Sequence, residues 1–126
     1  MTARHHQILL VEDDADIAGA MAAILEDEGY CVVHATDGEE ALRALREGLS
    51  PCLIVLDLFM PGMSGIEFRR IQQHDPSTAQ VPVIVVSGVA DMRKEIQAMG
   101  VARCFRKPVD VAALLGAVNE LCPPAA

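Results

Sequence analysis

Aromatic residues are scarce in this sequence. It contains no tryptophan, one tyrosine and three phenylalanines in 126 residues, so aromatics make up only 3% of the chain. Hydrophobic residues nevertheless account for 52% and charged residues for 22%, a balance typical of a folded globular protein. We therefore expect one domain with an aliphatic core, and no tryptophan platform on which a base or a sugar could stack.

Positive charge is also in short supply. Ten Lys and Arg residues stand against eighteen Asp and Glu, which gives a formal net charge of −8. This sign opposes direct binding to nucleic acid or to an anionic membrane. The sequence also lacks an uninterrupted apolar run of about 18 residues and a signal-peptide pattern at its start. We expect a cytoplasmic protein without a membrane span.

None of the four cysteines forms a CxxC pair. They lie in apolar contexts, at Cys31, Cys52, Cys104 and Cys122. These spacings do not favour a zinc site. We predict that the cysteines are buried, reduced and packed as small hydrophobic side chains, as in most cytosolic proteins.

Five short apolar runs alternate with five helical patterns. The strand-like runs cover residues 8–11, 31–34, 52–56, 83–86 and 102–106. Most are continuous rather than alternating, which is typical of strands covered on both faces. The helical patterns begin at Asp14, Gly38, Ser64, Asp91 and Asp110, and they end near Glu28, Glu47, Pro76, Gly100 and Pro123. Apolar residues expected on their inner faces include Ile17, Met21, Ile71, Met92 and Val111.

This alternation predicts an α/β fold, a doubly wound (βα)5 domain with a five-stranded parallel sheet. We assign residues 1–122 to this domain, and residues 123–126 to a tail or to the start of a linker. In such a sheet, ligands bind beyond the carboxyl ends of the strands. The polar residues there are Glu12, Asp13 and Asp14 after the first strand, Asp57 after the third, Ser87 after the fourth and Lys107 after the fifth.

A strand order of 2-1-3-4-5 would bring these strand ends together. Glu12, Asp13 and Asp57 would repel one another unless a cation lay among them. Oxygen ligands in an open, wet site favour Mg²⁺. With the ammonium of Lys107 and the hydroxyl of Ser87 beside it, Asp57 is placed to attack a phosphoryl group and form an aspartyl phosphate.

Each of these residues has a simpler explanation when it is taken alone. Acidic residues after the first strand would favour the first turn of a helix, and for Asp14 we prefer that role, as an N-cap. Ser87 precedes a glycine and would suit a turn. Lys107 would be a surface lysine ahead of a proline. The phosphoryl-transfer interpretation is favoured because all of them fall at one edge of the predicted sheet.

Four motifs in this order closely resemble the receiver domain of two-component response regulators. They are "ILLVEDDAD", "LIVLDLFMPGMSG", "VPVIVVSG" and "FRKP", and the resemblance extends from about residue 7 to residue 121. It implies a flavodoxin-like fold with Asp57 as the phospho-acceptor. It also implies Mg²⁺ held by Glu12, Asp13, Asp57 and the backbone carbonyl of Phe59.

The resemblance further implies a switch hydroxyl at Ser87, a phosphoryl-stabilising Lys107 and a cis Lys107–Pro108 bond. The expected donor is a histidine kinase or a histidine phosphotransfer protein. The expected output is a downstream protein or an attached output domain, and a homodimer is possible. Such a domain catalyses its own phosphorylation and slow dephosphorylation, and is not otherwise an enzyme.

Two features depart from the family pattern. Cys104 occupies the position three residues before the lysine where the family commonly has Tyr or Phe, and Phe105 should point to the other face of its strand. The stretch from Ser87 to Gly100 is short, so the fourth helix or the loop before it should be trimmed. A dimer through the fourth and fifth helices is correspondingly less expected.

Three other functions would use part of the same pattern. A haloacid-dehalogenase-like phosphatase would need a second Asp two residues after its nucleophile, where this chain has Phe59. A flavodoxin-like electron carrier would need a phosphate-binding loop after the first strand, where "VEDDAD" would repel the phosphate. A phosphorylation-independent pseudo-receiver, acting as a protein-binding module, would be expected to lack Asp13, Asp57 or Lys107. It remains the main alternative.

Overall fold

Strands and helices alternate along the chain in the computed structural model, which describes residues 7–88 and 93–123. The strands are β1 (Gln7–Val11), β2 (Cys31–Ala35), β3 (Leu53–Asp57), β4 (Val83–Ser87) and β5 (Arg103–Arg106). The helices are α1 (Ala15–Asp27), α2 (Gly38–Arg46), α3 (Gly65–His74), α4 (Arg93–Ala98) and α5 (Val111–Leu121). The predicted strands therefore agree with the observed ones to within one residue at each end.

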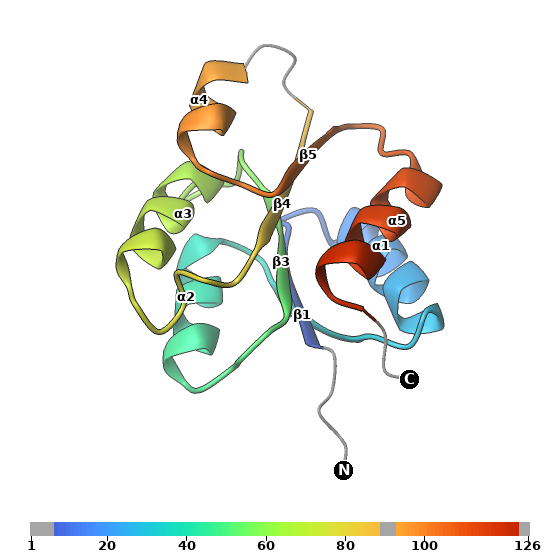
Figure 1. Cartoon of the computed structure of the whole chain (residues 1–126), viewed down its shortest axis with the longest axis horizontal. Coiled ribbons are helices and arrows are strands. Elements are labelled where there is room, and N and C mark those ends of the chain that lie inside the picture. The colour runs from blue at the N-terminus through green and yellow to red at the C-terminus, as the bar shows by residue number, and fades with distance from the viewer. Residues whose placement is uncertain (1–6, 89–92, 124–126) are drawn as a thin grey trace.

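The five strands form one parallel sheet in the order β2-β1-β3-β4-β5. Figure 1 shows the sheet between two helical layers, with α2, α3 and α4 on one face and α1 and α5 on the other. This arrangement confirms the predicted flavodoxin-like fold and its strand order. The carboxyl ends of β1, β3, β4 and β5 consequently lie along one edge.

The strands are buried on both faces because successive side chains point in opposite directions. Ile8 and Leu10 pack into a cluster with residues of α1 and α5. Leu9 and Val11 pack into a second cluster with residues of α2 and α3. All four side chains are at most 1% exposed. This two-sided burial explains why the strand sequences are continuously apolar.

Short polar side chains and glycines set the helix ends, as predicted. The Asp14 carboxylate accepts hydrogen bonds from the backbone N–H groups of Asp16 and Ile17 at 3.0 and 3.1 Å, so it caps α1. Gly29 and Gly100 have positive φ angles of 96° and 63° just after α1 and α4. Glycine reaches this left-handed region without a steric penalty, which allows the chain to leave the helix.

The helix α4 is the shortest of those described, with six residues. Because residues 89–92 lie outside the described residues, the expected trimming of this region stays a prediction. The predicted start at Asp91 and the inner-face residue Met92 lie outside the described residues. Within 7–88 and 93–123, no helix is long and apolar enough to cross a membrane.

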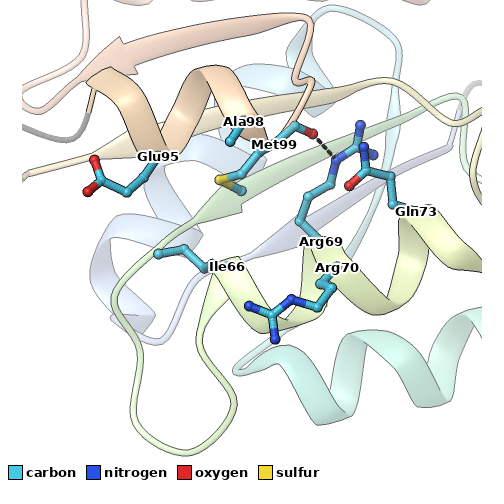
Figure 2. A pocket seen from close by; sticks show the side chains of 7 residues that line it. All are labelled: Ile66, Arg69, Arg70, Gln73, Glu95, Ala98 and Met99. Carbon is cyan, nitrogen blue, oxygen red and sulfur yellow. Dashed lines mark hydrogen bonds between the residues drawn. The ribbon is translucent and has the colours of Figure 1, made fainter.

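A buried arginine joins α3 to the turn that follows α4. The side chain of Arg69 is 6% exposed, and it donates a hydrogen bond to the carbonyl oxygen of Met99 at 2.8 Å (Figure 2). It donates another to the carbonyl oxygen of Gly100 at 3.0 Å. A third bond goes to Oε1 of Gln72 at 2.6 Å. Burial lowers the pKa of Arg69 from its usual value. The cation stabilises α4 because carbonyl groups at a helix C-terminus carry partial negative charge.

Three apolar side chains predicted to face the core are exposed instead. Ile17 on α1 is 37% exposed, Ile71 on α3 is 38% exposed and Val111 on α5 is 41% exposed. Each stands beside residues that are buried, such as Ala18, Phe68 and Leu114. The prediction was wrong here because an apolar stripe wider than the contact with the sheet leaves its margin in solvent.

The prediction of four buried, reduced cysteines was also wrong. Cys52 and Cys122 form a disulfide, with their Cα atoms 5.6 Å apart. Cys31 and Cys104 are free thiols in exposed positions on the two edge strands. The sequence could not indicate the bond because it joins residues 70 positions apart, which meet only after the sheet and α5 have assembled.

Candidate functional site

Three carboxylates gather at the carboxyl ends of β1 and β3, as predicted. Glu12 and Asp13 follow β1, and Asp57 is the last residue of β3. Each offers an oxygen, and these oxygens lie within 4.8 Å of one another. Glu12 and Asp57 are buried, at 2% and 6% exposure, whereas Asp13 faces solvent. The cluster is therefore open on the side of Asp13.

Lys107 reaches this cluster from the end of β5. Its Nζ lies 3.0 Å from Oε1 of Glu12 and 3.5 Å from Oδ2 of Asp57. The Lys107–Pro108 peptide bond is cis, which confirms the expectation. Lys107 carries a single positive charge, so it cannot by itself neutralise three carboxylates.

The electrostatics of the cluster follow from this imbalance. Burial raises the pKa of Glu12, although hydrogen bonds from Lys107 and from the backbone N–H of Asp14 oppose the change. Burial alone would lower the pKa of Lys107, but the hydrogen bond to Glu12 and the charge of Asp57 outweigh it and raise that pKa. The site therefore keeps Lys107 protonated and retains an excess of negative charge.

The donor set of this cluster fits a hard divalent cation. Glu12, Asp13 and Asp57 supply only oxygen atoms, and Asp13 gives access from solvent. Mg²⁺ prefers such sites, where a few carboxylates leave room for water and for phosphate oxygens. The predicted role of the Phe59 carbonyl stays a prediction. The N–H of Phe59 lies 3.4 Å from Oδ1 of Asp57, which places this residue beside the cluster.

Ser87 and Lys107 come from neighbouring strands and are joined through the backbone. Ser87 ends β4 with 2% exposure, and its carbonyl accepts the backbone N–H of Lys107 at 2.9 Å. Asp57 is the last residue of β3, and Ser87 is the last residue of the adjacent strand β4. Asp57 pairs with Val86, the residue before Ser87, in the sheet register. The strand ends thus bring Ser87 to the same edge as the acidic cluster. Its role as a switch hydroxyl stays a prediction.

Cys104 lies in the middle of β5, opposite Val85, and is exposed. Phe105 packs against the cluster formed with α1 and α5, which confirms that it points to the other face of the strand. Phe105 is therefore not turned toward the face that Cys104 occupies. The effect of a cysteine at this switch position stays a prediction.

Gly65 permits a close approach that the sequence did not reveal. It is the first residue of α3, and its N–H donates to the carbonyl of Leu58 at 3.0 Å. A Cβ atom at Gly65 would overlap the carbonyl oxygen of Asp57 and lie 2.8 Å from Cα of Leu58. The loop after Asp57 can therefore fold back against α3 only if residue 65 has no side chain.

We predict that Gly65→Ala lowers the free energy of unfolding by about 1–3 kcal/mol, because backbone atoms of Asp57 and Leu58 must move. Urea denaturation followed by circular dichroism would measure the change. The matched control is Gly19→Ala, where an added Cβ meets nothing within 4 Å. Since Gly19 lies inside α1, alanine should raise stability there by about 0.5–1 kcal/mol. Equal stability of the two variants would contradict the close-approach interpretation.

An apolar groove that is lined in part by Lys107 was not predicted. It has a volume of about 500 Å³ and lies between α1 and the segment from Lys107 to Val111. The exposed side chains Ile17 and Val111 contribute to it, which explains their exposure at this end of the sheet. The sequence did contain an indication of this groove, because the apolar stripe on α1 is wider than the surface that the sheet covers.

Comparison with known proteins assigns the chain to a family. Residues 8–119 match the model of the response regulator receiver domain. The DNA-binding response regulator MtrA of Mycobacterium bovis is 37% identical over 91 residues, which cover 72% of this chain and 38% of MtrA. The transcriptional regulator RpaA of Synechocystis is 33% identical over 117 residues, which cover 91% of this chain and 48% of RpaA.

A solved structure gives the same result. The response regulator receiver protein from Pseudomonas putida superposes with a TM-score of 0.87 at 31% identity, and the match covers 94% of this chain and 99% of that protein. The chain spans less than half the length of the two curated relatives above. Because the family model covers most of the sequence, and the fold and acidic cluster agree with it, this chain belongs to the receiver domains of two-component response regulators.

Proposed function

We propose that the chain accepts a phosphoryl group on Asp57 and changes conformation in response. The observation that carries this proposal is the position of the Asp57 carboxylate, which is 6% exposed and lies 3.5 Å from Nζ of Lys107. A carboxylate oxygen of Asp57 attacks phosphorus, and the bond from phosphorus to the donor breaks. When the donor is a phosphohistidine, the imidazole leaves.

The neighbouring residues hold and compensate charge during this transfer. Lys107 places its ammonium against the phosphoryl oxygens, and Ser87 offers a hydroxyl at the same edge. Glu12, Asp13, Asp57 and the carbonyl of Phe59 would hold Mg²⁺. When bound, Mg²⁺ supplies positive charge that offsets the negative charge of the phosphoryl oxygens.

The donor we propose is a histidine kinase or a histidine phosphotransfer protein. A protein that brings a phosphohistidine to Asp57 must cover the edge where Lys107 lies, and the apolar groove along α1 borders that edge. The exposed Ile17 and Val111 are suited to contact an apolar helix of the donor. Exposed acidic residues that shortly precede Ile17 in the sequence, such as Asp13 and Asp16, favour a donor with a basic rim.

The output we propose is control of a downstream protein or of an attached output domain, in the cytoplasm. This chain would act as a switch and not as an enzyme that turns over a separate substrate. Phe59 stands where a phosphatase with an aspartyl nucleophile would need an acid/base carboxylate, which supports this proposal.

The proposal is tested by incubating the chain with acetyl phosphate, in parallel with Mg²⁺ and with EDTA, and by measuring intact mass. We expect one added phosphoryl group in Mg²⁺ and none in EDTA, and peptide mapping should locate it at Asp57. A chain that gains no phosphoryl group in Mg²⁺ would instead be a pseudo-receiver that acts as a protein-binding module.

A further inference from the structure

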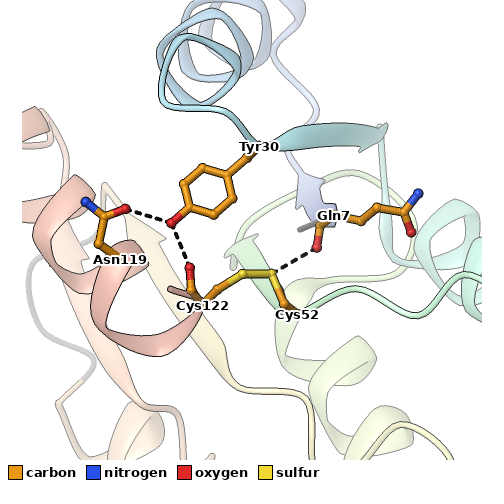
Figure 3. Close-up of a disulfide and its surroundings, with 5 residues drawn as sticks. All are labelled: Gln7, Tyr30, Cys52, Asn119 and Cys122. Atoms are coloured by element: carbon orange, nitrogen blue, oxygen red, sulfur yellow. Dashed lines mark hydrogen bonds between the residues drawn. A yellow bond between two sulfur atoms is a disulfide. The ribbon is translucent and has the colours of Figure 1, made fainter. Parts of the chain in front are cut away.

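The disulfide lies at the end of the sheet opposite the acidic cluster. Cys52 immediately precedes β3, and Cys122 follows the last residue of α5. The backbone N–H of Cys52 donates to the carbonyl of Gln7, the first residue of β1, at 2.8 Å. The bond thus joins the amino-terminal edge of the sheet to the end of α5 (Figure 3).

The surroundings of the pair suit both the oxidised and the reduced state. Sγ of Cys52 lies 3.3 Å from the carbonyl oxygen of Gln7. A disulfide sulfur has no proton to donate, but the free thiol of Cys52 has one, so this contact becomes a hydrogen bond when the pair is reduced. A polar partner therefore already stands beside the sulfur that would gain a proton.

The end of α5 has a second anchor that does not depend on the disulfide. The hydroxyl of Tyr30 lies 2.7 Å from the carbonyl oxygen of Cys122 and 2.7 Å from Oδ1 of Asn119 (Figure 3). Tyr30 is 3% exposed, so this hydroxyl is shielded from water. The hydroxyl of Tyr30 has a single proton, so it donates a hydrogen bond either to the carbonyl of Cys122 or to Oδ1 of Asn119. We therefore expect α5 to remain docked when the disulfide is open.

We propose that Cys52 and Cys122 form a reversible redox site, which is opened and closed by thiol–disulfide exchange with small thiols and disulfides of the glutathione class. In a reducing compartment such as the proposed cytoplasm, a disulfide is more often regulatory or redox-sensing than structural. This inference does not rest on phosphorylation of Asp57, and its test contains no phosphoryl transfer.

The chemistry balances with one small disulfide for each closing event. The Cys52 thiolate attacks a sulfur of the small disulfide, forms a mixed disulfide and releases one thiolate. The Cys122 thiolate then attacks Sγ of Cys52 and releases the second. The two cysteines are oxidised, the small disulfide is reduced to two thiols, and the protons of the cysteines pass through solvent to the released thiolates.

Exposure determines which sulfur reacts with the small molecule. Cys122 is 2% exposed, whereas Cys52 is half-buried. An incoming thiolate therefore reaches Cys52 more readily and releases Cys122 as the leaving thiolate. This order predicts that a mixed disulfide accumulates on Cys52 when Cys122 is replaced.

Closing the pair links β3, which ends in the acidic cluster, to α5, which follows Lys107 in the chain. The strand β3 starts after Cys52 and ends at Asp57, and α5 begins shortly after Lys107 and ends at Leu121, just before Cys122. Oxidation therefore joins, at the far end of the sheet, the strand that carries Asp57 to the helix that follows Lys107. We infer that the oxidised form restricts movement of α5 relative to the sheet.

The test equilibrates the native chain in glutathione buffers, quenches exchange with acid and alkylates the remaining thiols after denaturation, because Cys122 is too buried to react in the native chain. With excess reduced glutathione, we expect Cys52 and Cys122 to become alkylated together. With excess glutathione disulfide, both should be protected as one internal disulfide, and Tm should rise by roughly 10 °C because a long loop is closed. Cys31 and Cys104, which are free and exposed, serve as internal control thiols.

Two variants complete the test. Cys52→Ser/Cys122→Ser should keep the Tm of the reduced chain in both buffers, and Cys122→Ser should form a glutathione adduct at Cys52. A pair that stays disulfide-bonded after native incubation in excess reduced glutathione, and opens only when glutathione is added to the denatured chain, would be a fixed structural bond and would overturn reversibility. A native chain in which the two cysteines are never protected together would overturn the site itself.

Discussion

Replacement of Asp57 by asparagine is expected to abolish the Mg²⁺-dependent phosphoryl adduct and to leave the fold intact. Asparagine has nearly the same shape as aspartate, but its amide is not a nucleophile toward phosphorus. Intact mass after incubation with acetyl phosphate measures the loss directly. The fold should survive because β3 is buried by apolar side chains on both faces, and the substituted asparagine would keep the volume of the original side chain.

The same variant should lose the stabilisation that Mg²⁺ provides. A ligand that binds the native state at a hundredfold excess over its Kd stabilises it by about 2.7 kcal/mol. Without Mg²⁺, we expect Asp57→Asn to be at least as stable as the native chain. The negative charges of Asp57 and Glu12 repel each other in the native chain, and the substitution removes this repulsion. Thermal unfolding with and without Mg²⁺ would separate the two effects.

Glu47→Gln is the matched control for Asp57→Asn. It removes one negative charge from an exposed position at the C-terminal end of α2, away from the strand ends that form the cluster. The control should phosphorylate and respond to Mg²⁺ as the native chain does. An adduct of full yield on Asp57→Asn would show that the phosphoryl group goes to another residue.

Much of the site could be predicted because parallel strands impose one direction on the chain. Every strand of a parallel sheet ends at the same edge, so Glu12, Asp57, Ser87 and Lys107 had to converge once the strand order was known. The alternation of strands and helices predicted a parallel sheet, and the order was a hypothesis that the family resemblance supported. The helix ends could also be predicted, because Asp14 and the glycines act on backbone groups within a few residues of their own positions.

Other features depend on contacts that no local pattern records. Arg69 looks like a surface residue on an amphipathic helix, yet it is buried because the turn after α4 presents carbonyl groups to it. The Cys52–Cys122 bond depends on where α5 ends relative to the start of β3. The need for glycine at residue 65 depends on the backbone of Asp57, which lies against it in the fold and not next to it in the sequence.

The exposed Ile17 and Val111 show how a correct pattern can still assign the wrong environment. Both residues continue the apolar stripe of their helices, and periodicity predicts that such residues face the core. The sheet, however, ends beside them, and the groove next to Lys107 takes the place of a packing partner. Hydrophobic periodicity indicates which face of a helix is apolar, but it does not show how far the sheet extends beneath that face.

Replacement of Lys107 by methionine should separate metal binding from phosphoryl transfer. Methionine keeps the length of the side chain but removes the charge that lies 3.0 Å from Glu12 and 3.5 Å from Asp57. We expect the rate of phosphorylation by acetyl phosphate to fall by about 10²–10³-fold, the usual loss when one group that stabilises the transferring oxygens is removed. Mg²⁺ should bind at least as tightly as before, because a competing cation has left the cluster.

Stability should change in a way that Mg²⁺ reverses. Glu12 is 2% exposed, and without Lys107 it loses its hydrogen-bonded cation, so the free energy of unfolding in EDTA should fall by roughly 1–3 kcal/mol. Adding Mg²⁺ should restore most of the loss, since a divalent cation again offsets the carboxylates. Arg43→Met, which removes a positive charge from an exposed position on α2, is the matched control. It should change neither the rate of phosphorylation nor the free energy of unfolding in EDTA.

Lys107→Arg then distinguishes charge from geometry. Its guanidinium is positive, but it is planar and broader than an ammonium group, and the position between Glu12 and Asp57 is partly buried, with the lysine side chain 24% exposed. We expect Lys107→Arg to recover the stability in EDTA, because Glu12 again has a cation, but to recover little of the phosphorylation rate. A rate for Lys107→Met equal to that of Arg43→Met would contradict this role and leave Lys107 as the counterion of Glu12 alone.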